Sequence, residues 1–187
     1  LMLVLLLASS VCVAQTVFDH RLWDELLREN VVEIRGGVAT AVDYAGFLRQ
    51  RDQLTAYLDQ LAEVSRPAFE AWAVSDQLAF LINTYNAWTI ELILTGYPGI
   101  DSIRELGSFF SSPWSRGIVE LFGEQFTLDN IEHDMIRGWD RYREPRIHFA
   151  LNCAAIGCPA LRAEAYTGER LAEQLDDSTP RFLSDRT

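Results

Sequence analysis

The stretch SDQLAFLINTYNAWTIELILTGYPG, residues 75–99, decides the fold class of this chain. From Ser75 the chain runs without a helix-breaking residue until Gly96 and Pro98, and a serine is a favourable N-cap. Apolar residues occupy nearly every side of the helix that this spacing predicts. We therefore expect a long helix that begins at Ser75, ends before Gly96 and is buried in the core.

The regions on either side predict further helices and a hairpin. Residues 19–30 place leucines and a tryptophan at helical spacing with charges on the opposite face. Residues 42–65 repeat apolar residues at spacings of three, four and seven, which predicts a second helical region. Around Gly123 apolar and polar residues alternate, which indicates a short hairpin, and Thr127 is a suitable cap for a short helix that ends at Gly138.

Residues 146–152 alternate apolar and polar side chains, with Ile147 and Leu151 on one face and His148 and Asn152 on the other. This pattern predicts a strand that leads into a loop with two cysteines. The chain has 187 residues, of which 49% are hydrophobic and 23% charged, a composition typical of one globular domain. We expect a single, mainly helical α+β domain, with a small β-sheet carrying His148 and a long buried central helix.

The first residues predict export. LMLVLLLASSVCVAQ, residues 1–15, is an uncharged apolar run that ends in small residues, like a secretory signal peptide cleaved after Ala14. The run is short for a membrane span, and Val11 disfavours a lipid anchor at Cys12. No basic residue precedes the run, so we expect an incomplete signal peptide over residues 1–14 and a mature domain over residues 15–187, in the periplasm or outside the cell.

The charge of the chain limits its partners. A formal net charge of −11 and a pI near 4.6 argue against nucleic acid and anionic lipid, which both bind basic surfaces. A small molecule or a peptide of unknown identity is the substrate or partner that we expect.

Two asparagines lie on the predicted central helix. Asn83 and Asn86 are three residues apart, so their amides share one face of an otherwise apolar helix. A buried amide without partners costs about 1–3 kcal/mol, which requires hydrogen bonds on both of its atoms. We favour a role in tying loops to the helix through backbone groups, with a direct catalytic role as the alternative.

The histidines and cysteines do not form a common metal motif. Glu132 and His133 are adjacent on a predicted helix, so their side chains diverge by about 100° and do not easily face one ligand. The chain has no HExxH pattern, and the spacing of Cys153 and Cys158 differs from common zinc sites. We therefore expect neither a metal nor another cofactor.

Cys153 and Cys158 allow three interpretations. Either could be a nucleophile, Cys153 at the end of the predicted strand or Cys158 before Pro159 as a helix N-cap. If the chain stays extended, His148 lies roughly 16 Å from Cys153 and cannot act on it directly, which leaves His133 as another base. The alternatives are a local disulfide in an exported protein and a labile pair that exchanges with other thiols.

Several motifs together resemble one family. In chain order they are VDYAGF, LAFLINTYNAWTI, the YPGIDSIREL segment from Tyr97, LDNIEHDMIR, RIHFALNCAAIGCPALR and LAEQLDDSTPRFL. Their order over nearly the whole mature chain is similar to the DUF547 family. The resemblance implies exported bacterial members without a settled activity, and related domains in plant proteins with coiled-coil segments. It also implies that the family domain continues beyond the element Phe182–Asp185, so we expect a C-terminal piece to be missing here.

The resemblance places seven family motif residues in this chain: Asn83, Asn86, Glu132, His133, His148, Cys153 and Cys158. Our leading hypothesis is a thiol-dependent exported hydrolase or acyltransferase, in which Cys153 is the nucleophile and His148 or His133 the base. Asn83 or Asn86 would orient the base, and backbone N–H groups of residues 153–158 would hold the oxyanion. The competing hypotheses are a non-catalytic binding domain with a Cys153–Cys158 disulfide and a thiol-redox protein.

Overall fold

The structure is a computed structural model that describes residues 17–108, 110–155 and 157–185. It is a single α+β domain, mainly helical, with two small antiparallel hairpins. The predicted signal peptide and the Cys12 anchor lie outside the described residues. Within those residues, no helix combines the length and apolar character needed to cross a membrane.

The N-terminal half forms one side of the domain. It comprises α1 (Arg21–Asn30), β1 (Val31–Ile34), the 3₁₀ turn η1 (Arg35–Gly37), β2 (Ala39–Val42), α2 (Tyr44–Arg49), α3 (Arg51–Ala62) and α4 (Arg66–Glu70). Strands β1 and β2 pair antiparallel, with Val31 opposite Val42. The two helical regions predicted on this side are confirmed, the second as α2 and α3.

The C-terminal half starts with the central helix and is more irregular. It comprises α5 (Val74–Leu94), the 3₁₀ turns η2 (Ile103–Leu106) and η3 (Pro113–Ser115), β3 (Val119–Leu121), β4 (Glu124–Phe126), the π-helix η4 (Asn130–Arg137), the 3₁₀ helix η5 (Pro145–Phe149) and α6 (Leu171–Ser184). The β3–β4 hairpin confirms the expectation around Gly123.

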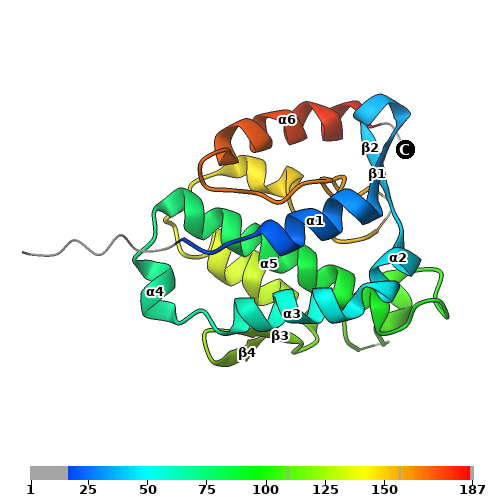
Figure 1. Ribbon diagram of the computed structural model, residues 1–187, viewed down its shortest axis with the longest axis horizontal. Helices are drawn as coiled ribbons and strands as arrows, with labels where there is room; N and C mark the ends of the chain where they lie inside the picture. Colours follow the sequence, from blue (N-terminus) through cyan, green and yellow to red (C-terminus); the bar gives the residue numbers. More distant parts are fainter. Residues whose placement is uncertain (1–16, 109, 156, 186–187) are drawn as a thin grey trace, which may run out of the picture.

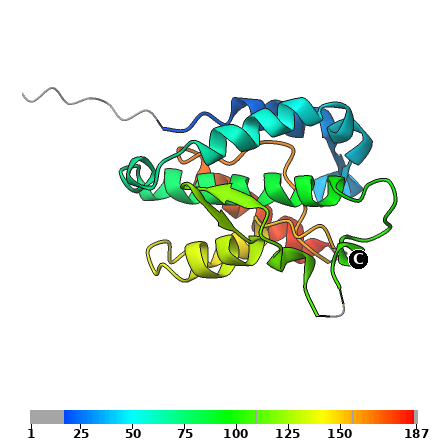
Figure 2. The ribbon, with the colours of Figure 1, turned by 90° about the horizontal axis from the view of Figure 1, so that it is seen from below.

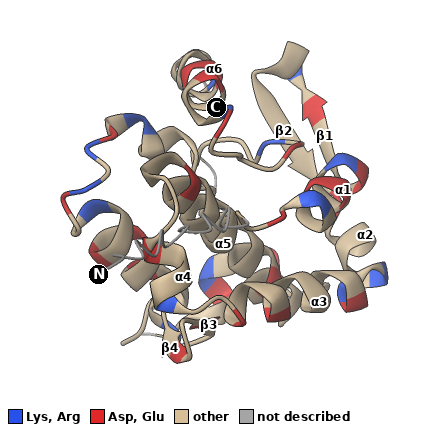
Figure 3. Ribbon diagram, turned by 60° about the vertical axis from the view of Figure 1, so that its left-hand side comes forward, with Lys and Arg blue, Asp and Glu red and all other residues tan. Residues whose placement is uncertain are grey.

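Helix α5 occupies the centre of the molecule (Figure 1). Seen from below, it runs between α1 and α3 on one side and η4 and α6 on the other (Figure 2). Charged positions lie on the outer helices α1, α3 and α6 (Figure 3), while α5 buries most of its residues. An apolar helix surrounded on all sides is what its sequence predicts, because each face then has a packing partner.

The predicted N-cap of this helix is wrong by two residues. The N-cap is Ala73 rather than Ser75, and the helix begins at Val74 without a side-chain cap. The turn before it is instead stabilised by Gln77, whose Nε2 donates to the backbone oxygens of Glu70 and Trp72. Gln77 is buried and reaches back over the turn, so a serine cap is not needed.

The predicted strand over residues 146–152 is also wrong. Residues 145–149 form η5, and His148 is an exposed residue of this 3₁₀ helix, not a sheet residue. The residues that are buried are Ile147, Ala150 and Leu151, at helical rather than alternating spacing. Pro145 sits in the first turn of η5, a start signal that the alternation of residues 147, 149 and 151 concealed.

Candidate functional site

The family motif residues surround the middle of α5. Asn83 is fully buried and holds the backbone of Tyr166 at two points: its Nδ2 donates to the Tyr166 oxygen over 2.8 Å, and its Oδ1 accepts from the Tyr166 nitrogen over 3.0 Å. Asn86 does the same one turn later. Its Nδ2 donates to the Ala150 oxygen over 3.0 Å, and its Oδ1 accepts from the Asn152 nitrogen over 2.9 Å.

Both asparagines therefore tie loops to the central helix through backbone groups, as favoured from the sequence. Each side-chain amide uses both its donor and its acceptor on backbone atoms of one neighbouring segment. The bonds make the segment between residues 150 and 166 a fixed attachment of α5, although that segment forms no helix or strand where it is described.

The two cysteines form a disulfide, with a Cα–Cα distance of 5.9 Å. Asn152, immediately before the loop, braces it at both ends: its Oδ1 accepts from the Ala154 nitrogen over 3.1 Å, and its Nδ2 donates to the Pro159 oxygen over 2.7 Å. Ala154 has a left-handed φ of 57°, a conformation that costs a non-glycine residue free energy. The disulfide and Asn152 together hold this turn, and residues 160–170 form a loop rather than the helix expected to begin at Pro159.

Glu132 and His133 lie on η4, which packs against α5. The N-cap of η4 is Asp129 rather than the predicted Thr127, although Oγ1 of Thr127 accepts from the Asn130 nitrogen over 3.0 Å and so stabilises the start of the helical segment. The hydrogen bonding is of the π type, however, which places more residues in a turn than the α-helical spacing assumed. The Nδ1 atom of His133 and the Oε1 atom of Glu132 are 4.0 Å apart. The two side chains therefore lie closer together than expected for adjacent residues of an α-helix.

Arg137, one turn later on η4, contacts both members of this pair. Its guanidinium lies 3.2 Å from Nδ1 of His133 and 4.0 Å from the Glu132 carboxylate. Below them, burial raises the pKa of the Tyr85 hydroxyl, and the nearby Glu132 carboxylate raises it further. Tyr85 therefore stays protonated, and as a neutral hydroxyl it can donate a hydrogen bond to Glu132.

Arg137 and His148 line the same cavity. We call this space the η4–η5 cavity; it has a volume of about 260 Å³ and is lined by η4, η5 and the segment between them, including Ile136, Arg137, Tyr142, Arg143, Glu144 and His148. Helix η5 is held in place by Arg146, whose Nη1 donates to Asp176 of α6 over 2.6 Å. Arg146 also binds Glu144, which lowers the pKa of that carboxyl.

Arg137, Tyr85 and the bracing role of Asn152 were not predicted from the sequence. Arg137 lies four residues after His133, a spacing at which helical side chains meet, so it was detectable. Tyr85 lies between the two asparagines, but nothing in the sequence indicates its proximity to Glu132. Among the described residues, no three histidine, cysteine or acidic side chains are grouped closely enough to hold a metal ion.

Fold and site together define a mainly helical α+β domain in which one buried helix fixes a disulfide loop and a histidine-bearing cavity. The model of the family described as "Protein of unknown function, DUF547" matches residues 69–183, which include all seven motif residues. The chain belongs to this family. Neither the curated proteins nor the solved structures that were compared include a match to it.

Proposed function

We propose that the protein is an exported binding domain that, in its oxidised form, performs no thiol chemistry. The observation that carries this proposal is the disulfide between Cys153 and Cys158. The nucleophilic form of cysteine is the thiolate, and a cysteine in a disulfide cannot form a thiolate. The asparagines support the same conclusion, because their amides are engaged with backbone groups.

The binding site in this proposal is the η4–η5 cavity, and its ligand is a small molecule with a carboxylate or phosphate group. The Arg137 guanidinium contacts His133 at 3.2 Å and forms only a long ion pair with Glu132 at 4.0 Å, which leaves most of its N–H donors open to a ligand. His148 is exposed and has no hydrogen-bond partner among the described side chains. Both acids at the rim are paired with arginines, Glu144 with Arg146 and Asp140 with Arg143. A guanidinium with free donors and a nearby imidazole form a favourable environment for an anion.

Export is part of the proposal. The apolar residues 1–14 support it, and so does the disulfide, because disulfides persist in oxidising compartments and are rare in the cytosol.

Alkylation of the purified, non-reduced protein tests the state of the cysteines. Iodoacetamide should modify neither Cys153 nor Cys158 at any pH until a reductant is added, with mass spectrometry as the readout. Rapid modification of one cysteine below about pH 7 would overturn the proposal, because it would demonstrate a free and stabilised thiolate.

Titration with inorganic phosphate and with succinate tests the ligand. The chain has three histidines, so the ring signals of His133 and His148 can be followed by NMR. A saturable shift of His148 is expected, and Arg137→Gln should weaken it about tenfold because a charge-assisted hydrogen bond is lost. Arg116→Gln is the matched control, an exposed arginine that does not line the cavity. Equal weakening by both variants would contradict a specific site.

The competing function is a thiol-dependent hydrolase or acyltransferase that is active after reduction, with Cys153 as nucleophile and His148 or His133 as base. One observation favours it. The chain from His148 to Cys153 begins in a 3₁₀ helix, so the extended separation of roughly 16 Å does not apply. If reduction exposes a thiol that reacts below about pH 7, and His148→Gln slows that reaction, this function replaces the binding proposal.

A further inference from the structure

A second cavity lies on another part of the molecule. It has a volume of about 540 Å³ and lies between the N-terminal end of α1, the first turns of α5 and the segment before α6. We call it the α1–α5 cavity; residues that line it include Phe18, His20, Asp24, Asp76, Ala79 and Thr167. It shares no lining residue with the η4–η5 cavity, and its volume falls in the range of small-molecule sites.

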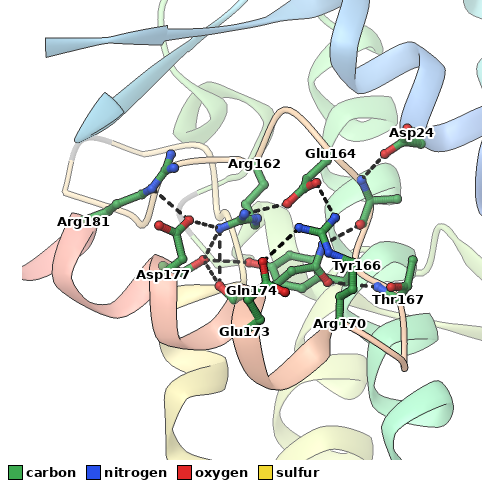
Figure 4. A network of polar contacts seen from close by, with 12 residues as sticks. Asp24, Arg162, Glu164, Tyr166, Thr167, Arg170, Glu173, Gln174, Asp177 and Arg181 are labelled. Carbon is green, nitrogen blue, oxygen red and sulfur yellow. Dashed lines mark hydrogen bonds and ion pairs between the residues drawn. The ribbon is translucent and has the colours of Figure 1, made fainter. Parts of the chain in front are cut away.

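One wall of this cavity is rigid (Figure 4). The Ala165 nitrogen donates to Oδ1 of Asp24 over 2.9 Å, and the Thr167 nitrogen donates to Oε1 of Gln174 over 3.0 Å. Gln174 also donates from Nε2 to the Ala165 oxygen over 2.8 Å, and Asn83 holds Tyr166 between them. The backbone of residues 165–167 is therefore fixed by three side chains from three helices, and the cavity is formed before any ligand enters.

The positive charges around the cavity are already compensated. Each arginine that lines it is held by a carboxylate within 3.0 Å: Arg21 by Asp19 (2.6 Å), Arg28 by Asp24 (2.6 Å) and Arg170 by Glu164 (2.9 Å). An anionic ligand would have to break one of these pairs, so the cavity does not favour one.

Asp76, in contrast, has no partner. Its carboxylate forms no hydrogen bond or ion pair with any described residue, although it is half-buried in the first turn of α5. Burial raises the pKa of this carboxyl, because its charged form loses part of its hydration in the cavity wall. Gly168 lies so close that a Cβ there would be 1.9 Å from Oδ1 of Asp76, so the carboxylate is confined to the cavity wall.

His20 is the second polar group of this cavity with an atom that lacks a hydrogen-bond partner. Only 9% of it is exposed, its Nδ1 lies 2.7 Å from the Tyr57 hydroxyl, and its Nε2 has no partner among the described residues. Burial lowers the pKa of His20 to about 3, so the ring is neutral and adds no positive charge. In the tautomer that donates from Nδ1 to Tyr57, Nε2 is an acceptor in the cavity.

We propose that the α1–α5 cavity binds a small organic amine with an apolar substituent. The ammonium group forms an ion pair with Asp76 and donates a second hydrogen bond to Nε2 of His20. The apolar substituent contacts Phe18 and Ala79. This ligand supplies the partner that both polar groups lack, and a cation suits a chain with a net charge of −11. The inference is independent of the function proposed for the η4–η5 cavity.

Benzylamine is a suitable probe and benzyl alcohol its neutral match. In an NMR titration of the full chain at pH 7, benzylamine should shift the ring signals of His20 saturably, and benzyl alcohol should bind at least about tenfold more weakly. Asp76→Asn keeps the shape of the side chain and should weaken benzylamine about tenfold. Asp59→Asn, on the exposed face of α3, is the matched control and should leave the affinity unchanged.

Three results would overturn the proposal: no saturable shift of His20, equal affinity for the amine and the alcohol, or equal effects of Asp76→Asn and Asp59→Asn. Thermal melting of both variants establishes that they are folded. Arg137→Gln, which tests the η4–η5 cavity, should leave benzylamine binding unchanged, so the failure of one proposal is distinguishable from the failure of the other.

Discussion

The two cavities differ in which charged group has the weakest partners within the protein. Both are lined by arginines and by acids. In the α1–α5 cavity the arginines are paired and a carboxylate, Asp76, remains. In the η4–η5 cavity Glu144 is bound by Arg146 and Asp140 by Arg143, while the Arg137 guanidinium has only a bond to His133 and a 4.0 Å ion pair with Glu132. The sum of charges along a wall therefore says little about its ligand, whereas the charged group with the weakest partners indicates the sign of charge that binding would compensate.

His20 of the α1–α5 cavity is buried, whereas His148 of the η4–η5 cavity is exposed. The burial of His20 gives the largest predicted effect on stability. The pKa of His20 is about 3 in the folded protein and near 6.5 when unfolded, so the unfolded state takes up the proton first as the pH falls. Stability from the neutral ring is present above pH 6.5 and is lost towards pH 3, by about 4 kcal/mol between pH 7 and pH 3. Urea unfolding at a series of pH values should show that the free energy of unfolding depends more steeply on pH in the wild type than in His20→Gln.

Tyr57→Phe is the control for that experiment. It removes the hydroxyl that binds His20 but keeps the ring buried, and burial rather than the hydrogen bond lowers the pKa. The variant should be less stable at every pH while the wild-type slope is retained. If His20→Gln keeps the full slope, the buried imidazole is not its source, and the contrast between the two cavities loses its main support.

Removal of a side chain that holds the wall of the α1–α5 cavity gives the second largest predicted loss of stability. Asn83→Ala leaves the buried N–H and C=O of Tyr166 without partners, which should lower the free energy of unfolding by about 3 kcal/mol. Gln60→Ala, on the exposed surface of α3, should change it by less than about 0.5 kcal/mol. Denaturant titration measures both, and a loss below about 1 kcal/mol for Asn83→Ala would show that the backbone of Tyr166 finds other partners.

The disulfide loop, which follows η5 of the other cavity, is expected to matter less. Replacement of Cys153 and Cys158 by serine opens a loop of six residues, for which chain entropy predicts a loss of about 2 kcal/mol. The comparison is between the oxidised wild type and the double variant in the same denaturant series. A loss as large as that of Asn83→Ala would mean that the bonds from Asn152 and Asn86 do not hold the loop on their own.

The smallest effect is expected at the rim of the η4–η5 cavity. Arg143 and Asp140 form an ion pair at 3.2 Å with about 80% of both side chains exposed, where water screens the attraction. Arg143→Gln should change the free energy of unfolding by less than about 0.5 kcal/mol while it weakens phosphate binding several-fold. A stability change above about 1 kcal/mol would show that this rim is structural and not available to a ligand.

Much of the fold could be predicted because its signals are local. The central helix, the helices before it and the hairpin around Gly123 follow from apolar periodicity and turn residues. The η5 segment could not, because Ile147, Phe149 and Leu151 alternate like a strand while the buried set is Ile147, Ala150 and Leu151. Five residues are too few to separate the two periods, so long-range packing decides between them.

In the site too, the features that depend on local sequence were predictable and those that depend on distant residues were not. The pairing role of Asn83 and Asn86 followed from the cost of a buried amide, which is a local argument. Their partners at Tyr166, Ala150 and Asn152 did not, since they lie more than sixty residues away in the chain. The proximity of His133 to Glu132 was missed because a π-helix has no sequence signature comparable to that of an α-helix.

The positions of the two asparagines have a consequence for how this domain can diversify. Because Asn83 and Asn86 are neighbours on one helix face, the segment from Asn152 to Tyr166 leaves α5 and returns to it within about one turn. It is an Ω-like loop whose ends are pinned by backbone bonds that do not depend on its own side chains. Leu161, Ala165 and Tyr166 of this segment lie in the core, so the domain can vary the segment at its exposed positions and present different surfaces there while these three residues are kept.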